Sequence, residues 1–105
     1  MSEPEDFHVE VTEAGPVVRA RLVGSLDGET VPALLGVVEP LLDGAEGLVL
    51  DCGPLAFCDS SGLRGFVLLR NRLAAPDTFR LEDPSPGLRQ ILVITGLEAL
   101  VADPT

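Results

Sequence analysis

The spacing of apolar residues limits the possible folds of this chain more than any other feature. Residues 7–13 (FHVEVTE) alternate apolar and polar side chains, and residues 17–26 do so again after the turn AGP at 14–16. This pattern predicts a β-hairpin. The apolar positions of its second strand share one face, so Arg19 and Arg21 are expected on the opposite face.

Further strands are expected later in the chain. Residues 48–52 (LVLDC) form a nearly continuous apolar run, which is typical of a strand buried on both faces. Residues 53–59 (GPLAFCD) are interpreted as the connection that leads out of it. Residues 79–83 (FRLED) predict a short strand, and residues 97–103 (LEALVAD) predict a weak final one.

The first helix is expected after Thr30, which is a good N-cap residue, with Pro32 in the first turn. Because Pro40 lacks a backbone donor and crowds the preceding turn, we expect this helix to kink or end near Glu39. Helical spacing predicts a core face made of Leu34, Leu35, Val38, Leu41 and Leu42.

Two more helices follow. The second is predicted over roughly residues 60–74 and is ended by APD at 75–77. The third begins with Ser85 as its cap and Pro86 in its first position, and Gly96 fits its C-terminal cap. The inward positions of the second helix include Leu63, Phe66, Val67 and Leu73.

The order β-β-α-β-α-β-α, with a possible final strand, predicts an α/β fold. Strands that alternate with helices form a mixed, mostly parallel sheet, here of four to five strands with about three helices packed on it. At 105 residues the chain is expected to form a single domain over residues 1–105, with its core at about 7–101.

The charge of the chain disfavours several classes of partner. It carries 17 acidic and 7 basic residues, a formal net charge of −10, and all of its basic residues are arginines. Because an acidic surface repels phosphate backbones and anionic lipids, we expect neither direct nucleic-acid binding nor binding to anionic membrane surfaces. Membrane insertion is not expected either, because the apolar runs are short. A partner with a basic docking face is expected instead.

Neither a metal nor a cofactor is expected. Cys52 and Cys58 lie in or beside apolar segments without the spacing of a zinc site, so they are interpreted as core residues in a reducing compartment. Residues 1–7 (MSEPEDF) lack the pattern of a signal peptide, and no apolar run is long enough to cross a bilayer. These features predict a cytoplasmic protein.

The stretch FCDSSGL at 57–63 is the best candidate for a functional site. Asp59 or Ser60 can cap the helix that follows, and capping alone would explain one such residue. Here three oxygen-bearing side chains occur in a row, where a helix N-terminus also favours a phosphate. The residues alone leave both interpretations open.

Four segments together resemble the STAS domain family, which includes stand-alone anti-sigma factor antagonists (anti-anti-sigma factors). They are the hairpin before residue 24, GSLDGET at 24–30, LVLDCGPLAFCDSSGL at 48–63 and LEDPSPGLRQILVITGL at 81–97. The resemblance covers nearly the whole chain and is far more specific than DSSG alone.

The resemblance implies a regulatory switch. In the family, the serine that follows the aspartate is phosphorylated by an anti-sigma factor that is a serine kinase, and the matching residue here is Ser60. The unmodified antagonist binds this kinase and releases a sigma factor, and a serine phosphatase reverses the modification. Matching positions imply that Asp27, Thr30, Asp59, Ser61 and Gly62 bind the partner, and a monomer is expected before binding.

Arg64 departs from the family pattern, which commonly has a small residue there. Lying one helical turn after Ser60, it could pair with a phosphate on that serine, contact an acidic patch of a partner, or remain solvated.

Three alternative functions remain, and one of them, the binding of a nucleotide or lipid, is neither supported nor excluded by the sequence. Stand-alone STAS domains also serve as structural subunits of membrane lipid-trafficking transporters, without phosphorylation. An enzyme is disfavoured because no G-x-S-x-G elbow or phosphate-binding loop occurs and His8 is the only histidine.

Overall fold

The computed structural model describes residues 7–75 and 78–100. The strands are β1 (His8–Ala14), β2 (Val17–Leu26), β3 (Gly47–Asp51), β4 (Leu55–Cys58) and β5 (Phe79–Glu82). The helices are α1 (Val31–Val38), α2 (Ser60–Arg70) and α3 (Pro86–Ile94), with short 3-10 turns at η1 (Glu39–Leu42) and η3 (Glu98–Leu100).

The sheet is mixed and mostly parallel, which confirms the predicted fold class. Its order is β1-β2-β3-β5, with β1 antiparallel to β2 and the other neighbours parallel. β3 and β4 pair with the same edge of β2, one after the other: β3 lies along residues 17–21 and β4 along residues 24–26.

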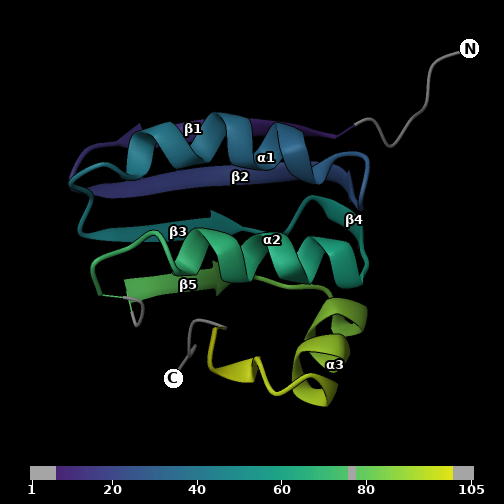
Figure 1. The fold of residues 1–105 in the computed structure, drawn as a ribbon. Helices are drawn as coiled ribbons and strands as arrows, with labels where there is room; N and C mark the ends of the chain where they lie inside the picture. The colour runs from purple at the N-terminus through teal and green to yellow at the C-terminus, as the bar shows by residue number, and fades with distance from the viewer. Residues whose placement is uncertain (1–6, 76–77, 101–105) are drawn as a thin grey trace, which may run out of the picture.

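The core lies between the sheet and two helices. Figure 1 shows α1 and α2 side by side over one face of the sheet, with α3 beyond β5. Helix α1 buries Leu34 and Val38, while α2 buries Leu63, Phe66 and Leu69 against the strands. The two largest buried side chains, Phe66 and Phe79, contact each other with ring centroids 6.3 Å apart.

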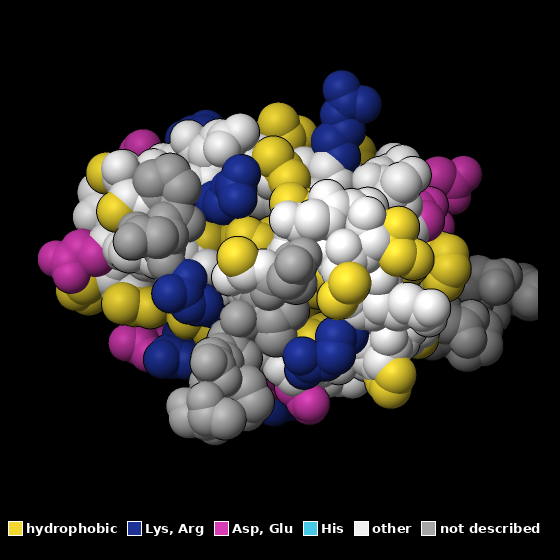
Figure 2. Space-filling model, turned by 90° about the horizontal axis from the view of Figure 1, so that it is seen from below, with side chains coloured by type: hydrophobic (Ala, Val, Ile, Leu, Met, Phe, Trp, Pro, Cys, Tyr) yellow, Lys and Arg dark blue, Asp and Glu magenta, His cyan; other side chains and the backbone are white. Residues whose placement is uncertain are grey.

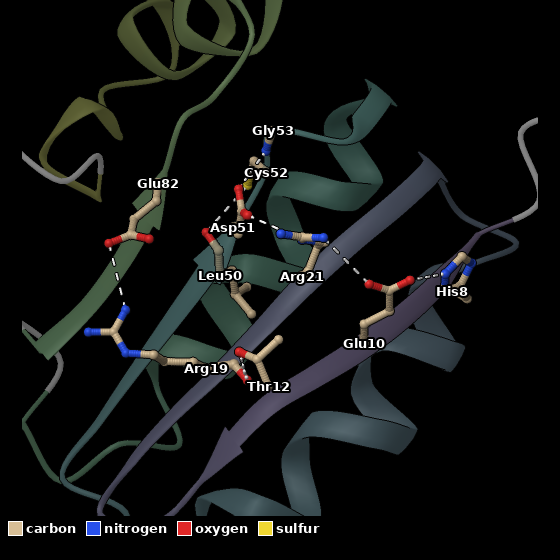
Figure 3. Close-up of polar contacts among 10 residues, drawn as sticks. All are labelled: His8, Glu10, Thr12, Arg19, Arg21, Leu50, Asp51, Cys52, Gly53 and Glu82. Atoms are coloured by element: carbon tan, nitrogen blue, oxygen red, sulfur yellow. Dashed lines mark hydrogen bonds and ion pairs between the residues drawn. The ribbon is translucent and has the colours of Figure 1, made fainter.

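The other face of the sheet is open and charged. Arg21 lies 3.9 Å from Glu10 and 3.5 Å from Asp51, and Arg19 contacts Glu13 at 3.4 Å and Glu82 at 3.8 Å. Figure 3 shows Arg21 between Glu10 and Asp51, and Arg19 reaching Glu82. The prediction that Arg19 and Arg21 share the face opposite the core is confirmed.

This open face corrects the prediction for residues 48–52. That strand is not buried on both faces: Leu48 and Leu50 are buried under the helices, whereas Val49 and Asp51 on the open face are only half-buried. Arginine side chains with long apolar stems border them, and this partial shielding allows an apolar run without a second layer of helices.

Several helices begin or end at the capping and helix-breaking residues that the sequence predicted. Helix α1 ends at Val38, and Pro40 lies in the 3-10 turn that follows, as predicted. The hydroxyl of Ser85 accepts the N–H of Leu88 at 3.1 Å, which confirms it as the cap of α3. Gly96 follows Thr95, the C-cap of α3, with a φ of 78°, a conformation suited to glycine.

Three predictions about element boundaries are wrong. Helix α2 ends at Arg70 and not near residue 74, and Leu73 is buried beyond its end. Residues 98–100 form a 3-10 turn in place of a final strand, and residues 101–103 lie outside the described part. Residues 55–58 form strand β4 where a connection was expected.

The prediction of one domain over residues 1–105 stays a prediction, because residues 1–6, 76–77 and 101–105 lie outside the described part. Of the helices that are described, none has the length and apolar character needed to cross a membrane.

Candidate functional site

The pairing of β2 with β4 builds the candidate site. Leu26 lies opposite Cys58 in parallel register, and the N–H of Asp59 donates to the carbonyl oxygen of Leu26 at 3.2 Å. Because both strands end at the same edge, the loop at residues 27–30 and the start of α2 leave the sheet side by side. All of the predicted site residues lie in these two segments.

Asp59 is the cap of α2. Its backbone is extended, with φ −106° and ψ −170°, and its Oδ1 accepts the N–H of Gly62 at 3.1 Å. Ser60 is the first residue of the helix, and its side chain is exposed. The acid therefore satisfies an amide of the first turn and leaves the Ser60 hydroxyl open to the outside.

Asp27 and Thr30 hold each other in the neighbouring loop. Oδ1 of Asp27 accepts the N–H groups of Glu29 at 2.9 Å and Thr30 at 3.2 Å. The Thr30 hydroxyl accepts the N–H of Asp27 at 2.9 Å and donates to the carbonyl of Ser25 at 2.9 Å. These hydrogen bonds fix the conformation of the loop in the protein without a partner.

The predicted cap role of Thr30 needs a correction. Thr30 occupies the N-cap position of α1, but its side chain makes no hydrogen bond to the first turn of the helix. Its hydroxyl points back into the loop because the N–H of Asp27 and the carbonyl of Ser25 are its partners there. Thr30 fixes the loop that enters α1, and it does not cap α1 itself.

Two glycines let the segments approach closely. A Cβ on Gly28 would lie 3.5 Å from Oγ of Ser61, so the loop contacts that serine. A Cβ on Gly62 would lie 2.6 Å from Sγ of Cys58 and 3.0 Å from Cγ of Leu26. Gly62 therefore sets how closely α2 packs on the ends of β2 and β4.

The two hydroxyls of the site differ in access. Ser61 is half-buried, next to Gly28, whereas Ser60 is exposed. Of the two, Ser60 has the more accessible hydroxyl. This difference in exposure favours Ser60 over Ser61 as the candidate residue.

Arg64 is exposed one turn after Ser60 on the same side of α2. Within residues 7–75 and 78–100, no hydrogen bond or ion pair of Arg64 is found. By contrast, Arg19, Arg21 and Arg72 all lie close to carboxylates.

The thiol of Cys58, which lies next to Asp59, is poorly suited to act as a nucleophile or a metal ligand. Burial, with a smaller contribution from the charge of Asp59, raises the pKa of Cys58 to about 12. Burial also raises the pKa of Cys52, with smaller contributions from Cys58 and two carboxylates. Both cysteines are free and stay protonated at neutral pH, whereas a thiolate is the form that attacks or binds metals.

No set of three or more histidine, cysteine, aspartate or glutamate side chains in the described part of the chain could hold a metal ion.

An apolar groove adjoins the site and was missed by sequence reasoning. It has a volume of about 200 Å³ and lies between β4 and α3. Phe57, two residues before Asp59, is 53% exposed at this groove. Its lining comprises Leu55, Ala56, Phe57, Cys58, Ser85, Gly87, Leu88 and Ile91. Figure 2, which views the molecule from below, shows apolar side chains and arginines interspersed over the face that carries α3.

No local signal could have located the groove, because its two walls, β4 and α3, are far apart in the sequence, with α2 and β5 between them. The stretch GPLAFCD shows no apolar–polar alternation that would reveal a strand, and the position of α3 is set by tertiary packing.

Comparison with known proteins supplies the family context. A family model described as "Mlab, STAS domain" matches residues 8–102. A search of curated protein sequences found no match.

Solved structures share the fold over nearly the whole chain. An anti-sigma factor antagonist from Mycobacterium paratuberculosis is 25% identical, with a TM-score of 0.83, covering 100% of this chain and 92% of its own. The unphosphorylated anti-sigma factor antagonist SpoIIAA is 25% identical, with a TM-score of 0.77, covering 95% and 89%. Phosphorylated SpoIIAA, a Bacillus cell fate determinant, is 25% identical, with a TM-score of 0.70, covering 95% and 92%.

Proposed function

Because this chain belongs to the STAS domain family, we propose that it is an anti-sigma factor antagonist switched by phosphorylation of Ser60. Unmodified, it binds an anti-sigma factor that is a serine kinase and so releases a sigma factor. The kinase phosphorylates Ser60 and ends the binding, and a serine phosphatase restores it. The protein itself performs no catalysis and acts in the cytoplasm, as a monomer before it binds.

One observation carries this proposal: the exposed hydroxyl of Ser60 stands at the first position of α2, beside the locked loop at 27–30. A phosphate there would add about −1.5 to −2 charges. That charge would be added to the surface formed by Asp27, Gly28, Asp59 and Ser60. The similarity to SpoIIAA, which has been solved in both unphosphorylated and phosphorylated forms, supports a switch by phosphorylation.

The docking surface has both polar and apolar parts. The loop at 27–30 needs no rearrangement to bind, because its hydrogen bonds are already made, which lowers the entropy lost on association. Phe57 adds an exposed aromatic ring next to Asp59, and aromatic rings are common anchors in interfaces. We assign Phe57 to the proposed surface on this ground.

The test uses the anti-sigma factor kinases of the same organism as purified partners. With ATP, the cognate kinase is expected to add one phosphate to the wild-type protein, located on Ser60 by fragmentation mass spectrometry. Ser60→Ala should remain unmodified and still bind the kinase, while Ser60→Asp should lose binding, because a negative charge mimics the modified state.

Ser61→Ala is the matched control for this experiment. It removes the neighbouring, half-buried hydroxyl, and any phosphate that this variant accepts should still be located on Ser60, whatever the effect on partner binding. Equal binding by Ser60→Ala and Ser60→Asp would contradict the proposal, as would phosphate transfer to Ser61.

A second candidate function is a structural subunit of a membrane lipid-trafficking transporter, bound without phosphorylation. The apolar groove between β4 and α3 favours it, because a permanent contact relies on buried apolar surface. The same experiment separates the two: stable co-purification with a membrane ATPase, unaffected by Ser60→Asp, would support the second candidate.

A further inference from the structure

In the loop at 27–30, in Asp59 and in the first two turns of α2, a phosphate on Ser60 would meet three acidic residues and one basic residue. Asp59 precedes it directly, and the neighbouring loop carries Asp27 and Glu29. Strand β4, helix α1 and residues 22–26 of β2, which lie around the start of α2, carry no charged side chain. Between Arg21 and Arg70, Arg64 is the only basic residue of the chain.

The position of Arg64 suits a partner on Ser60. Residues four apart on a helix lie one above the other on the same face, within reach of a long side chain. Arg64 is exposed and forms no ion pair with any residue of the described ranges, so its guanidinium is available. A guanidinium can also hold two phosphate oxygens at once, which an ammonium group cannot match in geometry.

From these observations we propose that Arg64 is the counter-ion of a phosphate on Ser60. The pair closes over the first turn of α2 when the serine is modified. This rests on the proposed function in that it requires Ser60 to carry the phosphate. It gives a chain-specific role to a residue that is otherwise a solvated charge.

The pair would make phosphorylation act in two ways. It adds negative charge at the docking surface, and it draws the Arg64 guanidinium away from any acidic group of the partner that it contacts in the unmodified state. Removing Arg64 should therefore leave phosphorylation possible but expose the full charge of the phosphate to its acidic surroundings.

The second ionisation of the phosphate measures the pair directly. Phosphoserine is inserted at position 60 during translation, so that no kinase is needed, and the phosphate is titrated by ³¹P NMR. Its pKa, normally about 6, should be higher by about 0.3–0.5 unit in Arg64→Gln than in the otherwise wild-type phosphoprotein. The difference should largely vanish in roughly 1 M salt, where screening acts within about 3 Å.

Arg72→Gln is the matched control. Arg72 is also exposed but lies beside Glu39 and Asp43, past the far end of α2, which is about 15 Å along the helix axis from Ser60. Its removal changes the net charge equally and should shift the phosphate pKa by less than about 0.1 unit. Equal shifts in the two variants, or none in Arg64→Gln, would overturn the proposed pair.

This outcome is separable from that of the proposed function. The NMR titration needs neither kinase nor partner, so it fails only if Arg64 does not meet the phosphate. The binding of Ser60→Ala and Ser60→Asp, in contrast, reports on the switch irrespective of Arg64.

Discussion

Asp59 offers a cap oxygen to α2 and a negative charge to the candidate docking surface, and these two properties can be separated. Its Oδ1 accepts the N–H of Gly62 at 3.1 Å. An asparagine can place an oxygen in the same position without the charge, whereas alanine removes both.

We predict that Asp59→Ala lowers the free energy of unfolding by about 1 kcal/mol, while Asp59→Asn retains most of it. Urea unfolding of the two variants measures this difference. Ser85→Ala is the control, because it deletes the corresponding cap of α3 at a similar distance, 3.1 Å, and should cost a comparable amount. If Asp59→Asn proves as unstable as Asp59→Ala, the cap hydrogen bond does not explain the role of this residue in folding.

At the scale of elements, the packing of α2 on the ends of β2 and β4 depends on the absence of a side chain at Gly62. An added Cβ would lie 2.6 Å from Sγ of Cys58, so either the helix or the strand would have to move. Cores tolerate such overpacking poorly because they are already filled.

Gly62→Ala is therefore expected to lower the free energy of unfolding by a net of about 1–2 kcal/mol, even though alanine favours the helix. Gly36→Ala is the matched control: this glycine of α1 is exposed, and an added Cβ meets nothing within 4 Å. That variant should gain up to about 1 kcal/mol from helix propensity. Denaturant unfolding of both proteins tests the prediction. A stabilised Gly62→Ala would show that the contact of α2 with Cys58 and Leu26 can accommodate a methyl group.

At the scale of the whole molecule, the composition makes its alkaline stability unusually simple to interpret. The chain has no tyrosine and no lysine, so the thiols are the only side chains that titrate between about pH 8.5 and 12. Burial raises the pKa of Cys58 from its usual value of 9.0 to about 12, and it raises the pKa of Cys52 as well.

We predict constant stability up to about pH 9 and a progressive loss above it. In that range the unfolded chain releases thiol protons that the folded chain keeps, so the unfolded state becomes more favourable as the pH rises. For Cys58 the loss extends to about pH 12, and each thiol contributes a slope of about 1.4 kcal/mol per pH unit.

Urea unfolding between pH 7.5 and 10.5, in the presence of a reductant, measures this slope. A protein with both Cys52→Ala and Cys58→Ala should show an almost flat profile over the same range, whatever its absolute stability. A slope that survives in the double variant would rule out the thiols as its source.

Much of the fold was readable from local pattern. The alternation in residues 7–26, the helical spacing after Thr30 and Ser60, and the cap at Ser85 each depend on neighbours a few residues away. Those neighbours determine which side chains can share a buried face. The DSSG stretch likewise pointed to a helix start, and Asp59 forms the expected cap.

Other features depend on contacts between distant segments. Residues 55–58 form a strand of four residues whose two middle side chains are exposed, so they show no apolar alternation of their own. Only their pairing with residues 24–26 makes them β4. The outer face of β3 is half-buried because no described helix covers that side of the sheet. An apolar run in the sequence does not show whether one or both faces of a strand will be covered.

The candidate site divides in the same way. The sequence by itself determined the chemistry of its residues: an acid that caps, a hydroxyl at the first helical position and an arginine one turn later. Only the tertiary structure decided that the loop at 27–30 lies against Ser61 and that an apolar groove opens beside Phe57. The physical reason is the range of the interactions: capping and helical spacing act within one turn of the chain, whereas β2, β4 and α3 meet only when the core is buried.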